Sequence, residues 1–294
     1  MSPRDLSLVL LVCVVWALNF ISGAKGMQAF PPMLFMVMRF LIVLTLTLPF
    51  LRLPPPGQWL RLASVCLFMG GLHFTFLFWA LKLSADVTSI AILQNMYIPI
   101  AVLLAIFFLG EKAGWRTLGS TAMAFAGVLV IGFDPLVLGQ LDALGLILLS
   151  AACQAIASVL MRGLHGMGPM NFQGWTALFA LPVLALASWL FESNQLAAIS
   201  QAQPGHWAAL CYSAVVASLV GHGLFFVLVQ RNPLPRLMPY MLLMPVLAAL
   251  FGVVIWGDRP GPRLLLGGSL VLLGILFITL RGRSKAQALA VDPE

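Results

Sequence analysis

The feature that most limits the fold of this chain is its series of continuous apolar runs. Each run is about 17–25 residues long, the length at which a helix crosses the hydrocarbon core of a bilayer. In lipid, only helices and closed barrels satisfy their backbone polar groups, and a barrel would show short segments of alternating polarity instead. Only 9% of the residues are charged, whereas soluble domains carry about 25%. The sequence therefore predicts an all-α polytopic membrane protein.

Turn residues divide the apolar sequence into ten predicted transmembrane helices. We expect them at roughly 6–23, 33–51, 58–80, 87–109, 116–133, 142–162, 171–191, 206–230, 236–256 and 263–281. The first has an alternative interpretation as a signal peptide, because Arg4 precedes the run and Ser22-Gly23-Ala24 ends it with small residues. Trp16 and Asn19 inside the run argue against that alternative.

A second feature is an internal repeat at one constant spacing, half the chain length. The corresponding residues are Gly110, Gly114, Arg116 and Gly127 in the first copy, and Gly257, Gly261, Arg263 and Gly274 in the second. Five helices per half is an odd number, so the two halves would cross the membrane in opposite directions, an arrangement typical of secondary transporters. We expect one five-helix repeat at 1–138, a second, inverted repeat at 139–285, and a cytoplasmic tail at 286–294.

Lysine and arginine residues of the short loops predict the orientation. With the N-terminus inside, eleven of them fall on the cytoplasmic side and four on the other, as basic residues tend to do. Both termini are therefore expected in the cytoplasm. This orientation explains the net charge of +7, so no nucleic-acid partner is predicted.

Several motifs resemble a known family. The motifs Trp16-Ala17-Leu18-Asn19-Phe20, Arg39-Phe40 and Gly110-Glu111-Lys112 resemble the bacterial EamA branch of the drug/metabolite transporter superfamily. The motifs Gly221-His222-Gly223, Pro239 to Val246 and Gly257-Asp258-Arg259 are most similar to its O-acetylserine/cysteine exporters. The chain departs from the family where Lys25 lies nine residues after Trp16, not eight, and where Asp258 replaces a glutamate. The resemblance implies a ten-helix exporter in the bacterial inner membrane.

Ionisable residues within the spans are the first candidates for function. Arg39 is the only formal charge well inside a span; it either faces a central cavity and holds a carboxylate or backbone carbonyls of the other half, or it snorkels to one membrane face or joins helices. His73 and His222 occupy equivalent spans and are candidates for proton coupling, or else they form hydrogen bonds between helices. All nine acidic residues lie at span ends or in loops, so facilitated export without a proton stays open.

A substrate cavity needs polar and aromatic side chains on inward faces. The candidates are Trp16, Asn19, Arg39, His73, Phe76, Trp79, Gln94, Asn95, Tyr97, Gln154, Ser158, His222, Phe226 and Tyr240. Pro99 and Pro245 are expected to free the carbonyls of Asn95 and Met241, which could bind an ammonium group. In the alternative interpretation, polar residues only hold helices together and proline only kinks them.

The repeated turns have a predicted structural role. Glu111 and Asp258 are expected to start the fifth and tenth spans, paired with Arg116 and Arg263, where the helix dipole favours an acid. Glycines in those spans allow close packing, either within the chain or in a homodimer; they are Gly119, Gly127, Gly267, Gly268 and Gly274.

These observations predict a secondary transporter working by alternating access. The resemblance implies export of small amino-acid-like metabolites of the cysteine/O-acetylserine type. Drugs or other hydrophobic or cationic metabolites are the alternative cargo, and uptake stays open. A membrane-embedded enzyme would need a nucleophile or metal cluster, and the sequence contains no such motif and no ATP-binding loop. We therefore expect no catalytic residue, no metal and no cofactor; the predicted partners are the lipid bilayer and a small-molecule substrate.

Overall fold

The computed structural model describes residues 3–84, 87–109, 115–132, 140–161, 163–231, 240–241 and 243–291, and all regular structure in them is helical. The predicted first half contains α1 (Pro3–Gly26), α2 (Pro32–Thr47), η1 (Leu48–Phe50), α3 (Trp59–Cys66), η2 (Leu67–His73), α4 (Phe74–Leu83), α5 (Val87–Gln94), α6 (Tyr97–Leu109) and α7 (Trp115–Gly132). The second contains α9 (Leu141–Met161), α10 (Pro169–Phe191), α11 (Gln195–Gln201), α12 (Pro204–Cys211), η3 (Tyr212–His222), α13 (Gly223–Arg231), α15 (Leu243–Phe251), η4 (Gly252–Trp256) and α16 (Pro262–Val291).

Long apolar helices confirm the predicted class of polytopic α-helical membrane protein. Six helical stretches are long and apolar enough to cross a bilayer: Pro3–Gly26, Pro32–Phe50, Trp59–Leu83, Leu141–Met161, Pro169–Phe191 and Pro204–Leu228. Shorter apolar helices cover Val87–Ala101, Ala122–Ile131, Leu243–Trp256 and Pro262–Gly274. All ten stretches fall within predicted spans or extend them by a few residues, while the count of ten crossings stays a prediction.

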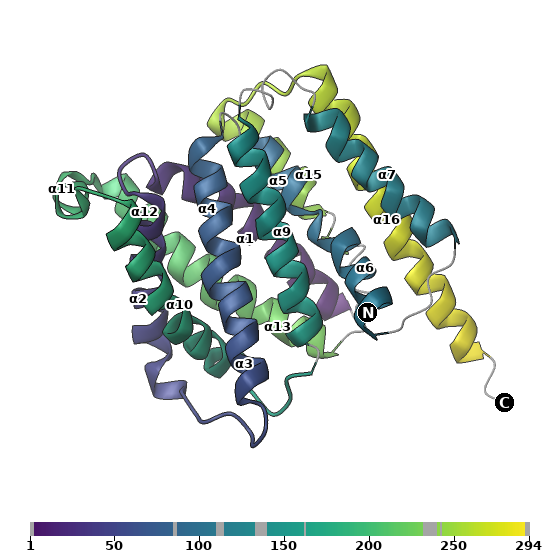
Figure 1. Ribbon diagram of the computed structural model, residues 1–294, viewed down its shortest axis with the longest axis horizontal. Coiled ribbons are helices and arrows are strands. Elements are labelled where there is room, and N and C mark those ends of the chain that lie inside the picture. The colour runs from purple at the N-terminus through teal and green to yellow at the C-terminus, as the bar shows by residue number, and fades with distance from the viewer. Residues whose placement is uncertain are drawn as a thin grey trace.

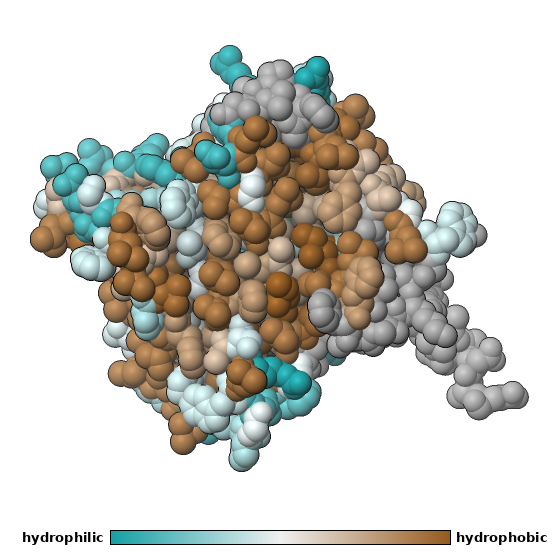
Figure 2. All heavy atoms as spheres, viewed as in Figure 1, coloured by the Kyte–Doolittle hydropathy of each residue, from teal (hydrophilic) through white to brown (hydrophobic). Residues whose placement is uncertain are grey.

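The surface carries the band of apolar side chains that a lipid environment requires. Figure 2 shows hydrophobic residues across the middle of the molecule and hydrophilic residues gathered at its upper and lower ends. Large apolar side chains such as Leu186, Trp189 and Phe191 are exposed on this surface. Exposure of this extent would be unfavourable in water.

Helices of the two predicted halves pack against each other in pairs. α2 lies on α10, α4 on α9, and α1 on α15 and η3. α7 and α16 pack side by side at one edge of the bundle (Figure 1). The interface between the halves therefore runs through the centre of the molecule, where the α1, α4, α9 and η3 contacts meet.

The edge pair α7 and α16 depends on two glycines. A Cβ atom added to Gly127 would lie 2.6 Å from the carbonyl oxygen of Gly267, and one added to Gly267 would lie 2.7 Å from that of Gly127. By contrast, a Cβ added to Gly119 on α7 would meet nothing within 4 Å. Of the two uses predicted for the glycines, Gly127 and Gly267 thus serve a contact within the chain.

Two of the long helices contain π-helical segments, and a third predicted span is interrupted. η2 ends at His73 and η3 ends at His222. The predicted span 87–109 is broken between α5 and α6, where the N–H of Ile98 donates to the carbonyl of Asn95 at 3.0 Å. The expectation that Pro99 leaves this carbonyl free is therefore wrong: Pro99 has no N–H to offer, but a tighter turn supplies the donor one residue earlier.

A carboxylate of the second half caps the N-terminus of α2. Glu192, just after α10, accepts the backbone N–H groups of Met33 at 2.6 Å and Leu34 at 2.9 Å, and the hydroxyl of Ser188 at 2.8 Å. The first N–H groups of a helix have no partner within the helix, so an acid here satisfies them and complements the helix dipole.

Asp258 caps the N-terminus of a second helix of the first half in the same way. Its Oδ2 atom accepts the N–H groups of Val87 at 3.0 Å and Thr88 at 2.9 Å and the Thr88 hydroxyl at 2.8 Å, at the start of α5. The sequence had placed Asp258 at the start of its own following helix, so α5 is a partner that it did not predict. Gly252 makes room, because a Cβ there would lie 2.5 Å from Oδ2. Glu111 lies outside the described residues, as does the side chain of Arg116, and Arg263 is exposed.

Candidate functional site

The centre of the bundle contains a cavity of about 50 Å³, here called the polar cavity. It is lined by Trp16, Asn19, Phe20, His73, Phe74, Leu77, Phe78, Leu81, Gln94, Asn95, Tyr97, Gln154, His222, Met241 and Met244. These residues come from both predicted halves. The set includes most of the side chains that the sequence predicted for a cavity: Trp16, Asn19, His73, Gln94, Asn95, Tyr97, Gln154 and His222.

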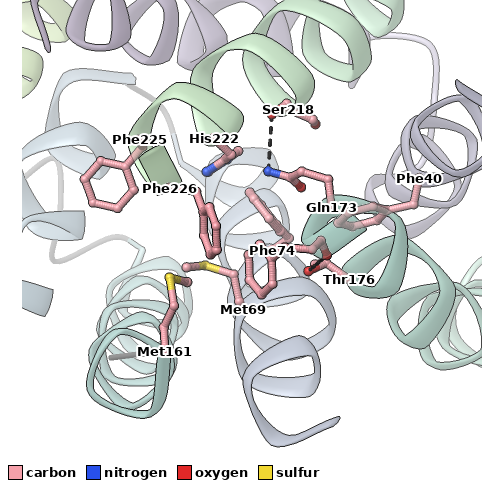
Figure 3. A pocket seen from close by; sticks show the side chains of 11 residues that line it. Phe40, Met69, Phe74, Met161, Gln173, Thr176, Ser218, His222, Phe225 and Phe226 are labelled. Carbon is pink, nitrogen blue, oxygen red and sulfur yellow. Dashed lines mark hydrogen bonds between the residues drawn. The ribbon is translucent and has the colours of Figure 1, made fainter. Parts of the chain in front are cut away.

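A second cavity of about 20 Å³, the aromatic cavity, shares Phe74 and His222 with the first. Figure 3 shows the residues that line it. It is lined by Phe40, Met69, Phe74, Met161, Phe172, Gln173, Thr176, Ser218, His222, Phe225 and Phe226. Gln173 reaches across it and donates to the backbone carbonyl of Ser218 at 3.3 Å. Phe226, another predicted site residue, belongs to this second cavity.

Five predicted cavity residues line neither space; they are Arg39, Phe76, Trp79, Ser158 and Tyr240. The ring of Trp79 packs on Phe191 with centroids 6.1 Å apart, and the hydroxyl of Ser158 donates to the carbonyl of Gln154 in its own helix at 2.7 Å. The backbone carbonyl of Tyr240 accepts the thiol of Cys13 at 3.5 Å. Phe76 is half-buried outside both linings.

Side chains beside the polar cavity form a hydrogen-bonded chain between the two halves. The hydroxyl of Ser150 lies 2.8 Å from Nδ1 of His73 and 2.9 Å from Oε1 of Gln94, and Nε2 of Gln94 donates to Oε1 of Gln154 at 2.6 Å. A hydroxyl has one proton, so one consistent arrangement has His73 donating to Ser150 and Ser150 donating to Gln94. Sequence reasoning missed Ser150, although it lies four residues before Gln154 on one face of α9.

Arg39 is fully buried, with none of its surface exposed, which contradicts the snorkelling alternative. Its Nε donates to the hydroxyl of Ser218 in the other half at 2.9 Å, and its guanidinium carbon lies 4.5 Å from the ring centroid of Phe74. Because Phe74 lines both cavities, Arg39 lies directly behind their shared wall. No ion pair of Arg39 occurs among the residues that the structure describes.

Three buried polar atoms around the polar cavity have no hydrogen-bond partner. They are Nε1 of Trp16, Oδ1 of Asn19 and Nη2 of Arg39. Such atoms are rare because each one costs about 1–3 kcal/mol when buried without a partner. Two donors and one acceptor are thus unpaired beside the cavities, and no acidic side chain lines either cavity in the described part of the chain.

A helical membrane protein whose predicted halves enclose a polar cavity has the architecture of a secondary transporter. The sequence profile of the EamA-like transporter family matches residues 5–133 and 142–280. The chain belongs to that family, and this confirms the resemblance to the drug/metabolite transporter superfamily. The family is one of transporters, which supports, at the family level, the expectation that the chain is not an enzyme.

Several curated relatives of this chain carry names of amino-acid exporters. A "Probable amino-acid metabolite efflux pump" of Escherichia coli (strain K12) is 27% identical to this chain, and the match covers 99% of each protein. This chain is 29% identical over 96% of both chains to the protein of that name in Salmonella typhimurium. A "Probable terminal-alkyne amino-acid exporter" of Streptantibioticus cattleyicolor is 25% identical over 62% of this chain and 60% of its own.

A solved crystal structure shares the fold. It superposes with a TM-score of 0.63 at 20% sequence identity and covers 97% of this chain and 99% of its own. At this identity the likeness concerns the architecture alone. It supports the helical arrangement that positions the two cavities.

Proposed function

We propose that this protein exports small amino-acid-like metabolites, of the cysteine or O-acetylserine type, across the bacterial inner membrane. The similarity to amino-acid metabolite efflux pumps supports this cargo class. We further propose that ten helices cross the membrane as two inverted five-helix repeats, with both termini in the cytoplasm. Movement of one repeat against the other would then expose the central site to each side in turn.

The observation that carries the cargo proposal is the set of unpaired buried atoms. An amino-acid zwitterion needs donors for its carboxylate and an acceptor for its ammonium group. Nη2 of Arg39 is an unpaired donor and Oδ1 of Asn19 an unpaired acceptor. Nε1 of Trp16 is also unpaired, but it lies against Gly221, where an added Cβ would be 2.6 Å from it. In this proposal Arg39 binds the carboxylate and Asn19 binds the ammonium group. The side chains of His73, Gln94 and Gln154 form other polar walls of the cavity, and together with Ser150 they are already linked by hydrogen bonds.

The size of the polar cavity supports a mechanism in which the halves separate to admit the substrate. About 50 Å³ holds only a few water molecules, since a single water needs about 10–15 Å³ by the same measure. An amino acid is several times larger than a water molecule. Binding therefore requires the α1 and α4 side of the cavity to move from the α9 and η3 side.

Efflux from loaded proteoliposomes tests the proposal. Vesicles containing the protein are loaded with radiolabelled cysteine, O-acetylserine or an aromatic amino acid, and efflux is followed with and without a pH gradient. Arg39→Gln should slow amino-acid efflux by roughly 10- to 100-fold, the value of a hydrogen bond to a charged group. Arg52→Gln is the matched control, because the Arg52 side chain is exposed in a loop and the hydrogen bonds of Arg52 to Asn171 and Trp175 use its backbone.

The alternative cargo is a cationic or hydrophobic compound, and the same vesicles separate the two. Efflux of a cationic dye without efflux of any amino acid would overturn the amino-acid proposal while leaving the fold intact. A fully buried arginine and cavity walls without described acids make a cationic cargo electrostatically unfavourable. We therefore expect the dye to be retained.

A further inference from the structure

The two central cavities share two of their lining residues, and these two form the wall between them. Phe74 begins α4 in the first half, and His222 ends η3 in the second half. Both line the polar cavity and the aromatic cavity. Their rings meet edge to face, with centroids 5.5 Å apart and planes at 85°. The wall is therefore built by one ring from each half.

The cavities follow one another along the same helix. Met69 in η2 lines only the aromatic cavity, and Leu77 in α4 lines only the polar cavity. Phe74 lies between these positions, on the helical run that joins them. Eight residues of α-helix would rise about 12 Å, so the cavities lie one after the other along the run, and Phe74 faces both.

Each ring of the wall is contacted by a residue of another helix. The guanidinium carbon of Arg39 lies 4.5 Å from the centroid of Phe74, within the range of a cation–π interaction. The ring of Trp16 packs on His222 with centroids 4.6 Å apart. Both supporting residues also carry one of the unpaired donors. A ligand that takes those donors would therefore act directly on the groups that hold the wall closed.

The local helix geometry gives the wall a means of moving. η2 ends one residue before Phe74, and η3 ends at His222. A π-helical turn contains one residue more than it would in an α-helix, and such turns are frequent at functional sites. Conversion of π to α geometry would rotate a neighbouring side chain by roughly 100°, the angle per residue of an α-helix. A rotation of that size carries a ring out of the wall.

We propose that Phe74 and His222 form a gate between two chambers of the transport path, and that a substrate carboxylate opens it by drawing the Arg39 guanidinium away from Phe74. The second clause rests on the proposed function, because it needs a carboxylate-bearing cargo. The first clause stands on the geometry of the wall. Phe74 and His222 thereby become positioning residues for export and not only part of the cavity lining.

Cysteine reporters on either side of the wall test the gate without relying on transport. Cys13, Cys66, Cys153 and Cys211 are replaced by serine or alanine, and Met69→Cys or Leu77→Cys is introduced singly. Modification by a membrane-impermeant thiol reagent is timed from each membrane face. With Phe74 intact, we expect each reporter to react faster from one face than from the other.

Phe74→Ala should accelerate the slow reaction of the reporter beyond the wall by about tenfold, the scale of a lost cation–π contact. Phe76→Ala is the matched control, because Phe76 lies two residues further on the same helix and lines neither cavity. Equal rates in the two variants would overturn the gate. Gel filtration in detergent verifies the fold, and Phe74→Leu replaces Phe74→Ala if the latter aggregates, with Phe76→Leu as its control and a smaller acceleration expected.

Labelling in the presence of substrate distinguishes failure of this inference from failure of the proposed function. Added O-acetylserine should accelerate the slow reporter when Arg39 is present, and Arg39→Gln should abolish that response. If Phe74→Ala opens the wall but O-acetylserine and aromatic amino acids have no effect, the gate stands and the carboxylate trigger is wrong. If efflux occurs but Phe74→Ala behaves like Phe76→Ala, the exporter stands and the gate is wrong.

Discussion

At the scale of single residues, the central site combines polar groups that are fully paired with others that are not. Ser150 lies between His73 and Gln94, and its hydroxyl forms a hydrogen bond with each of these side chains. Arg39, in contrast, keeps one buried guanidinium nitrogen unpaired. Paired groups hold the helices in register, whereas an unpaired group gains a bond only when a ligand arrives. The two kinds of residue should respond differently to substitution.

Ser150→Ala should lower stability and not only activity. The change removes a hydroxyl from the chain that runs from His73 to Gln154 and leaves Oε1 of Gln94 buried without its donor. Stranding a buried polar group costs about 1–3 kcal/mol. Thermal unfolding in detergent, followed by tryptophan fluorescence, measures the loss. Ser269→Ala is the control, because its exposed hydroxyl donates only to Leu265 in its own helix; an equal effect in both would contradict the role given to Ser150.

The sequence predicted most of the polar residues at the cavity because helix periodicity alone places Trp16 with Asn19 on one face. It did not predict Ser150, since serine is common in membrane helices and its position gives no partner. Nor could it place Trp79 outside the cavity. Trp79 lies three residues after Phe76 and six after His73, but only its contact with Phe191 of a distant helix shows which way it faces.

At the scale of whole helices, two acids of the second half hold two helix starts of the first. Glu192 binds the start of α2, and Asp258 binds the start of α5. Each contact joins residues more than a hundred positions apart in the chain. Local sequence reasoning assigns an acid to its nearest helix, so it could not predict these partners. Only the packing of the two halves brings them together.

Removal of the Glu192 carboxylate should destabilise the junction of the halves. Glu192→Ala leaves the N–H groups of Met33 and Leu34 unsatisfied, and loss of a helix cap costs roughly 0.5–2 kcal/mol. Glu192→Gln keeps an acceptor and should lose less. The comparison uses the unfolding midpoint in detergent. Asp142→Asn, at an exposed position in the first turn of its own helix, should change the midpoint little; a larger loss there than in Glu192→Ala would refute the assignment.

The contact between α7 and α16 makes a prediction about two glycines of one helix. Gly127→Ala would press a methyl group onto the Gly267 backbone, and overpacking of this kind costs about 1–3 kcal/mol. Gly119→Ala meets open space and should gain up to about 1 kcal/mol from higher helix propensity. Opposite shifts of the unfolding temperature are expected. A loss of stability in Gly119→Ala alone would indicate instead that this face packs on another molecule, as in the predicted homodimer.

At the scale of the whole molecule, composition and periodicity were enough to predict the class, because a chain so poor in charge has few folds open to it. The pairing of α2 with α10 and of α4 with α9 was not predictable. The apolar helices offer nearly equivalent lipid-facing and protein-facing sides, and hydropathy does not distinguish them. Orientation is different, since it depends on charges that the sequence shows directly.

The predicted membrane topology can be tested at two exposed leucines. Leu53, between α2 and α3, should face the cytoplasm, and Leu196, in α11, should face the opposite side; both side chains are largely exposed, at 78% and 83%. In a background without native cysteines, an impermeant maleimide added to intact spheroplasts should label Leu196→Cys and spare Leu53→Cys. Inside-out vesicles should reverse the result, and permeabilised membranes should label both. Labelling of both positions from one face would rule out the predicted topology, because an odd number of predicted helices lies between them and must carry the chain from one side of the membrane to the other.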